Sequence, residues 1–186
     1  MTPAMHQTFS QAARVAAVVV TFSAVAWAAD SQKEAVKEAK DTLAAFKEKD
    51  PGLKKHVDQA VAYLVLPRVQ KGGFLVAGGG GEGVLFEKGV ATGTVKMSQL
   101  TFGAQVGGQS FSELVLFKDV EALKDFKEKE KELEAGGTGA VAGNTATTKN
   151  LEYHKGVAIV TMVRGGVMAE ASVGGQKFEF RAFEKP

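Results

Sequence analysis

The glycines at positions 78, 80 and 83 supply the motif most suggestive of chemistry, because their spacing matches the dinucleotide-binding fingerprint. That fingerprint requires a helix directly after the glycines, since the helix N-terminus holds the pyrophosphate. Here Val84-Leu85-Phe86 follows, which is typical of a strand. We therefore expect these glycines to shape the backbone, with no nucleotide and no other cofactor bound.

Nucleophiles and metal ligands are sparse. The 186 residues contain no Cys, which excludes a thiol nucleophile, a disulfide and a thiolate zinc site. No Ser stands in Gly-x-Ser-x-Gly, and His56 and His154 have no helix-spaced partner. We expect both histidines to be isolated. The alternative is a zinc site built from these two His and a carboxylate that folding brings together. The sequence predicts no catalytic residue, no metal site and no enzymatic activity.

Basic residues are the better candidates for function. Lys33, Lys37 and Lys40 recur at i, i+4 and i+7, so they share one side of a predicted helix, beside an apolar stripe of Val36, Ala39, Leu43 and Phe46. Such a face can lie on an anionic membrane, where each cation near the surface contributes about 1 kcal/mol. The alternative is an ordinary surface helix that docks its stripe on a sheet, and the acids between the lysines favour that interpretation.

Two further cations stand beside paired glycines. Lys71 precedes Gly72-Gly73 and Arg164 precedes Gly165-Gly166, and each motif lies between two apolar runs. The same turn used twice would explain the pattern. Contacts to an anion are the alternative, because accessible backbone N–H groups beside a cation can hold a phosphate.

Residues 1–28 have the character of a signal peptide. They contain no Asp or Glu and one basic residue, Arg14, followed by an apolar run that ends in Ala26-Trp27-Ala28. We expect cleavage after Ala28 and a periplasmic or secreted protein, with an uncleaved membrane anchor as the alternative. The net charge of +2 is too small to indicate nucleic-acid binding.

The rest of the chain predicts one α+β domain over residues 29–186. Helices are expected over 30–62, interrupted at Asp50-Pro51-Gly52, and over 119–134, with Asp119 as N-cap and Gly136 as stop. Short strands are expected at 63–66, 74–77, 84–86, 100–106, 112–117, 157–163, 167–173 and 177–183, with a weak one at 139–143. The glycine-rich segments 78–83 and 107–109 are predicted to be turns. This pattern favours a twisted antiparallel sheet, open or closed into a barrel-like shape, with two N-terminal helices and one inserted helix.

Three blocks of the chain, in order, resemble the SYLF domain family. Residues 63–85 resemble its opening block, with an apolar strand, Pro67, Lys71-Gly72-Gly73-Phe74 and a glycine stretch. Residues 102–117 are similar to its middle block, and 153–167 to its last. The resemblance implies a non-enzymatic domain that binds phosphoinositide or other anionic lipid, with a basic amphipathic N-terminal helix at the membrane. The chain departs from the family in the acids of its first helix and in Met168-Ala169-Glu170.

We therefore expect an exported module that binds anionic lipid at the surface of the bacterial cell envelope, peripheral on a membrane. An anionic phospholipid is the more plausible ligand, because phosphoinositides are scarce in bacteria. The expected lipid contacts are Lys33, Lys37, Lys40, Lys71 and Arg164. The alternative is a structural or protein-interaction module that contacts an envelope protein and has no lipid ligand. The oligomeric state stays open.

Overall fold

The computed structural model describes residues 30–128, 131–134, 138–141 and 151–184. The chain forms two compact units, residues 1–37 and 38–186. The described helices are residues 30–49, α2 (Leu53–Gln59) and α3 (Val120–Glu128). The strands are β1 (Ala62–Glu87), β2 (Val90–Phe117), β3 (Lys131–Glu134), β4 (Thr138–Val141) and β5 (Val157–Ala182). The predicted signal peptide and its cleavage site lie outside the described residues.

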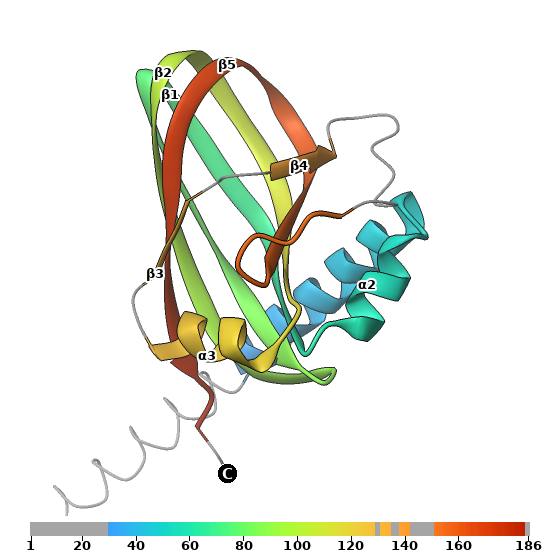
Figure 1. Ribbon diagram of the computed structural model, residues 1–186. Helices are drawn as coiled ribbons and strands as arrows, with labels where there is room; N and C mark the ends of the chain where they lie inside the picture. The colour runs from blue at the N-terminus through green and yellow to red at the C-terminus, as the bar shows by residue number, and fades with distance from the viewer. Residues whose placement is uncertain (1–29, 129–130, 135–137, 142–150, 185–186) are drawn as a thin grey trace, which may run out of the picture. The chain divides into compact units, whose positions relative to one another are not determined.

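One five-stranded sheet organises the fold (Figure 1). β1 pairs with β2, β2 with β5, and β5 with β3, all antiparallel, while the short β4 runs parallel to the start of β5. The predictions of an α+β fold, an antiparallel sheet, two N-terminal helices and one inserted helix are confirmed. The barrel-like form is not adopted, because β1 ends the strand order on one side and does not pair with β3.

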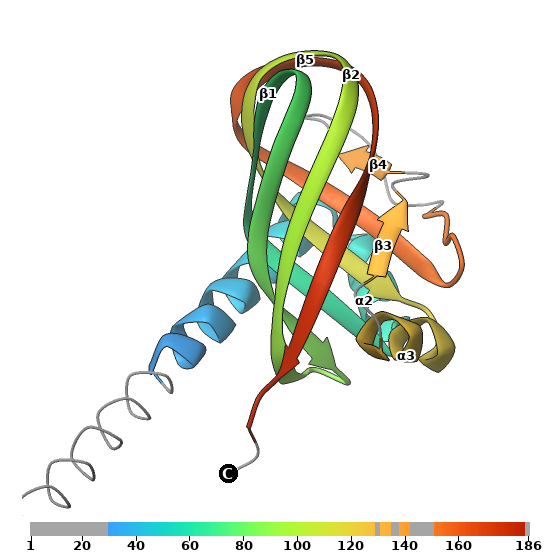
Figure 2. The same cartoon turned by 90° about the vertical axis from the view of Figure 1, so that its left-hand side faces the viewer.

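The three long strands each bend halfway along their length (Figures 1 and 2). The glycine-rich segments predicted as turns, at 78–83 and 107–109, lie inside β1 and β2, and the short strands expected around them are halves of 26- and 28-residue strands. The reversal between β1 and β2 occurs at Lys88 and Gly89, whose φ angles are 50° and 81°. Pro67 does not end its strand either, because it sits in a bulge of the edge strand, where its missing N–H is tolerated.

Glycine allows the two halves of β1 to lie directly against each other. A Cβ added at Gly79, Gly81 or Gly83 would lie only 2.5, 2.5 or 2.3 Å from the carbonyl oxygens of Gln70, Arg68 and Val65, respectively. Any side chain at these alternate positions would push the halves apart. The glycine run is therefore required by the close approach of backbone to backbone.

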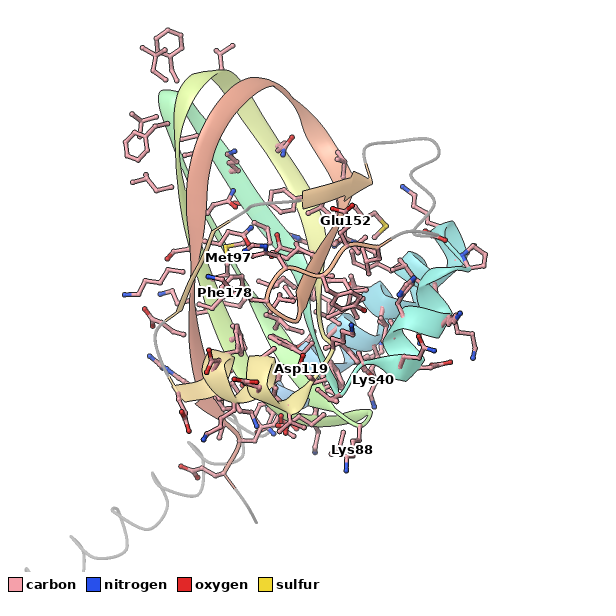
Figure 3. The ribbon with its side chains drawn as sticks, viewed as in Figure 1. Lys40, Lys88, Met97, Asp119, Glu152 and Phe178 are labelled. Carbon is pink, nitrogen blue, oxygen red and sulfur yellow. The ribbon has the colours of Figure 1, made fainter. Side chains whose placement is uncertain are left out.

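The interior between the two halves is apolar at the end opposite the bend. Met97 and Phe178 point into it (Figure 3) and are each 1% exposed. α3 covers this end, and its Phe126 ring packs 4.9 Å from the ring of Phe117 and 5.6 Å from that of Phe178. The Asp119 carboxylate accepts a 2.8 Å hydrogen bond from the Ala122 N–H, which confirms the predicted N-cap.

The sheet half formed by the start of β1 and the end of β2 is also buried on its other face. Val65, Leu114 and Leu116 have no exposed surface. In the predicted apolar stripe of the first helix, Ala39, Leu43 and Phe46 are buried and Val36 is half-buried. Leu53 and Val57 of α2 are buried as well. Within residues 38–186, the first helix is therefore an ordinary docked helix along its apolar stripe. Its lysines occupy the exposed faces.

Two helix boundaries were predicted wrongly. The second helix ends at Gln59 and not at residue 62, because the β-branched and aromatic run from Val61 onward pairs with β2. The third helix ends at Glu128, and Lys131–Glu134 forms strand β3 against β5. Val120, the first residue of α3, is 68% exposed. Gly136 and residues 142–143 of the weak strand lie outside the described residues.

Candidate functional site

The bend of the sheet carries a cluster of exposed apolar side chains, which we call the apex. Its members are 47–69% exposed: Phe74, Leu75, Val76, Leu100, Phe102 and Val106. Phe74 pairs with Val106 and Val76 with Phe102, and residues paired across an antiparallel ladder share one face. The apex is therefore one continuous outer patch on two strands, at the end of the sheet away from α3 (Figure 1).

The apex is also free of charge along both strands that form it. Residues 72–78 of β1 and 100–108 of β2 contain no Lys, Arg, Asp, Glu or His. The neighbouring β5 contributes one ionisable residue at this level, Glu170, in register with Gln105. Protein-binding surfaces usually have a polar rim, whereas a surface that enters a bilayer excludes charge because desolvating it is costly.

Leu75 holds a strained backbone conformation at the centre of the apex. Its φ angle is 61°, in the left-handed region that disfavours side chains with a Cβ. It stands at a register shift between Phe74 and Val76, and its side chain is 55% exposed. A glycine would relieve this strain, so folding alone does not explain a leucine here.

The predicted lysine contacts lie on the first helix. Lys33, Lys37 and Lys40 are all exposed. Lys33 lies 3.7 Å from the Asp30 carboxylate, a weak pair because both side chains are about 80% exposed. Lys40 lies on the helix beside the sheet, far from the bend (Figure 3). These exposed cations can face a lipid surface.

Lys71 and Arg164 stand at neighbouring levels of the sheet, on the two strands that flank β2. Lys71 pairs with Gln109, which pairs with Gly166. Neither forms the predicted turn, since both lie within long strands. Lys71 is buried, at 8% exposed. Its role as a lipid contact stays a prediction, and its low exposure leaves little surface for a head group.

Arg164 occupies a bulge in β5 and stabilises a second bulge in β1. Its guanidinium Nη1 donates a 2.7 Å hydrogen bond to the carbonyl oxygen of Pro67. The Ser112 hydroxyl donates to the same oxygen, also at 2.7 Å. Arg164 thus joins β5 to β1 across β2. The two similar cation-glycine motifs therefore occupy neighbouring levels of the sheet, on the two strands that flank β2.

A polar group lies inside the fold, on the side of the apolar interior nearer the bend. Glu113 has no exposed surface, and its Oε2 accepts a 2.9 Å hydrogen bond from Gln176 Nε2. The same nitrogen donates to Gln99 Oε1 at 3.2 Å. Burial raises the pKa of Glu113 to about 7, against the opposing effect of the Gln176 hydrogen bond. Sequence reasoning missed this group because Glu113 stands in an apolar strand without any motif.

Sequence reasoning also missed the apex. Phe74 and Phe102 were assigned to strands, without a prediction that their side chains are exposed. The available signal was the nearby glycine pairs at 72–73 and 107–108. Glycines have no side chains, so they cannot cover Phe74 and Phe102.

Other chemistry is limited in the part of the chain that the structure describes. Within it, no three His, Asp or Glu side chains gather closely enough to hold a metal ion. None of its helices is both long and apolar enough to cross a bilayer. The glycines of the nucleotide-like motif lie within β1, which continues to Glu87 without a helix. No protein-family model matches the chain, and no curated protein matches its sequence. The resemblance to the SYLF family stays a prediction.

Proposed function

We propose that this protein is a non-enzymatic module that binds the surface of an anionic membrane in the cell envelope. The observation that carries the proposal is the apex, an uncharged apolar patch exposed on a projecting bend of the sheet. Clustered exposed apolar side chains of this kind mark sites of interaction with a membrane or a partner. The missing charge and the strained Leu75 favour a membrane.

The apex supplies enough apolar surface for reversible binding. Phe74 and Phe102 are 69% and 55% exposed. Since full burial of such a side chain is worth about 1.5–3 kcal/mol, inserting the exposed parts of these two contributes about 3 kcal/mol, roughly a hundredfold in the binding constant. Lys33, Lys37 and Lys40 add a salt-sensitive attraction to anionic lipid that decays within about 10 Å.

Vesicle co-sedimentation tests the proposal with the chain lacking residues 1–28, so that the apolar N-terminal run does not contribute. Vesicles of phosphatidylglycerol, cardiolipin or neutral phosphatidylcholine are compared at low and high salt. We expect binding to anionic vesicles that weakens, but persists in part, at high salt. Folded protein that ignores all three kinds of vesicle would contradict the proposal and favour the alternative, a module that binds an envelope protein.

Paired variants separate the two contributions. Phe74→Ser with Phe102→Ser lowers binding at both salt concentrations, because it removes the inserted surface. The matched control is Val90→Ser with Val120→Ser, two valines that are 65% and 68% exposed outside the apex. Equal loss from both pairs would refute the role of the apex. Changing the three helix lysines together to Gln lowers binding at low salt alone.

A further inference from the structure

The interior polar group has two unsatisfied oxygen atoms, one on each of two side chains that are already hydrogen-bonded to each other. Glu113 Oε1 and Gln176 Oε1 are buried and have no hydrogen-bond partner among the described residues. The other atoms of the same two groups, Glu113 Oε2 and Gln176 Nε2, are already joined at 2.9 Å. Two buried acceptors without a donor would cost several kcal/mol in all. A single proton supplies the missing donor.

We propose that Glu113 and Gln176 form a buried proton-binding site, a cyclic carboxylic acid–amide pair in which Glu113 carries the proton on Oε1 and donates it to Gln176 Oε1. The amide already donates from Nε2 to Glu113 Oε2, so the proton closes the second half of the ring. The proton comes from solvent, and no other bond changes. This site is independent of the proposed membrane function, since it rests on the interior and not on the apex.

The surroundings of Glu113 offer no charge to stabilise a carboxylate. Its register partners are Leu66 on β1 and Thr161 on β5. Gln99 and Gln176 face it from the other half of the sheet. Burial and the Gln176 hydrogen bond are the only causes of the pKa shift, so no cation among the described residues contributes to it.

The charged groups of the adjoining elements lie at other positions. On β5, Lys177 and Glu179 alternate with the buried Gln176 and Phe178, which places them on the opposite face. β3 brings three charged residues into register with residues 175–178, namely Lys131, Glu132 and Glu134. β4 has no charged residue. On β1 the nearest cation along the strand is Arg68, two residues beyond Leu66 and exposed, and Lys71, three residues further on, is 8% exposed. On β5, Arg164 lies three residues beyond Thr161 and is exposed, and its guanidinium donates to the Pro67 carbonyl oxygen. A neutral acid is the form of Glu113 that suits this setting.

The proposed pair joins the two halves of the bent sheet. Glu113 lies in the second half of β2, and Gln176 lies in the second half of β5, in register with Gln99 of the first half of β2. Ionisation would leave a buried carboxylate beside the orphaned Gln176 oxygen, and both would favour water. The halves are thus held together more tightly when the proton is bound.

Infrared spectroscopy of the full chain tests the site, because a protonated carboxyl has a carbonyl band distinct from that of a carboxylate. At pH 6 the exposed Asp and Glu side chains are ionised. We expect one protonated-carboxyl band in the folded wild type at pH 6, lost with a midpoint near pH 7. Glu113→Gln abolishes the band, and the control Glu82→Gln, an exposed residue of β1, leaves it unchanged.

The exchanged pair, Glu113→Gln with Gln176→Glu, keeps the test decisive even where the single variant fails to fold. It preserves one acid and one amide, so the band returns and again titrates near neutral pH. A folded wild type without the band at pH 6, or a band that Glu113→Gln leaves intact, would overturn the proton site. An exchanged pair that folds without the band would overturn the cyclic arrangement.

Discussion

The burial of Glu113 makes the stability of the fold depend on pH in a direction opposite to that of most carboxyl groups. Its pKa rises from 4.5 in the unfolded chain to about 7 in the folded one. Between these values the folded state binds one proton more than the unfolded state. The free energy of unfolding therefore falls as pH rises, and the stabilisation present below pH 4.5 is lost as pH passes through 7.

The size of this effect follows from the two pKa values. One unit is worth 1.36 kcal/mol at 25 °C, so the rise from 4.5 to about 7 corresponds to about 3 kcal/mol. That is a large share of the stability of a typical domain, about 5–15 kcal/mol. Glu113→Gln lacks the titration but keeps the shape and the hydrogen-bonding capacity of the neutral acid. The variant should equal the wild type near pH 4.5 and exceed its stability by about 3 kcal/mol above pH 8.

Urea denaturation at a series of pH values measures the difference between the two proteins. Far-UV circular dichroism is the suitable signal, because the single tryptophan, Trp27, lies in the N-terminal segment and not in the sheet. Taking the difference removes the titration of all other groups. A stability difference that does not change between pH 4.5 and 8 would refute the reasoning, and so would a wild type that gains on the variant as pH rises.

Three further predictions concern the bend. Gly81→Ala places a Cβ 2.5 Å from the carbonyl oxygen of Arg68 and should lower the free energy of unfolding by about 1–3 kcal/mol, whereas Gly78→Ala meets nothing within 4 Å and should be nearly neutral in urea denaturation. Leu75→Gly should leave stability unchanged or higher while weakening vesicle binding, and a parallel loss of both would contradict the role of its strain. Arg164→Gln removes the bond to Pro67 and should cost about 1–2 kcal/mol of stability with vesicle binding retained, so loss of binding alone would restore the residue as a lipid contact.

The class of the fold was accessible from the sequence because periodicity reports burial. The stripe of Ala39, Leu43 and Phe46 docks as predicted, and the cap at Asp119 forms as predicted. The order of helices and β-rich segments was also read correctly. These features depend on local spacing, which a single sequence displays directly.

The course of the strands was not accessible, because glycine has two structural uses that look alike in sequence. In a turn it provides a positive φ, as Gly89 does. In a strand it allows another backbone to come close, as Gly79, Gly81 and Gly83 do. The three positions alternate along the chain, which is the period of a strand. That period is the sequence signal that separates a glycine in a strand from a glycine in a turn. Lys71 was expected in a turn for the same reason and instead lies within β1, at 8% exposed.

The apolar identity of the apex is the feature that folding explains least. The bend needs glycine for close approach and for strained backbone, and the chain uses it at positions 72–73 and 107–108. Between those glycines, Phe74 and Phe102 stay largely exposed and pack into no core, and Leu75 keeps a φ of 61° that a glycine would accept without strain. Polar side chains would serve the fold equally well at these positions and would keep the surface soluble. Six exposed apolar residues on two strands that carry no charged residue at this level therefore support the proposed insertion into a bilayer.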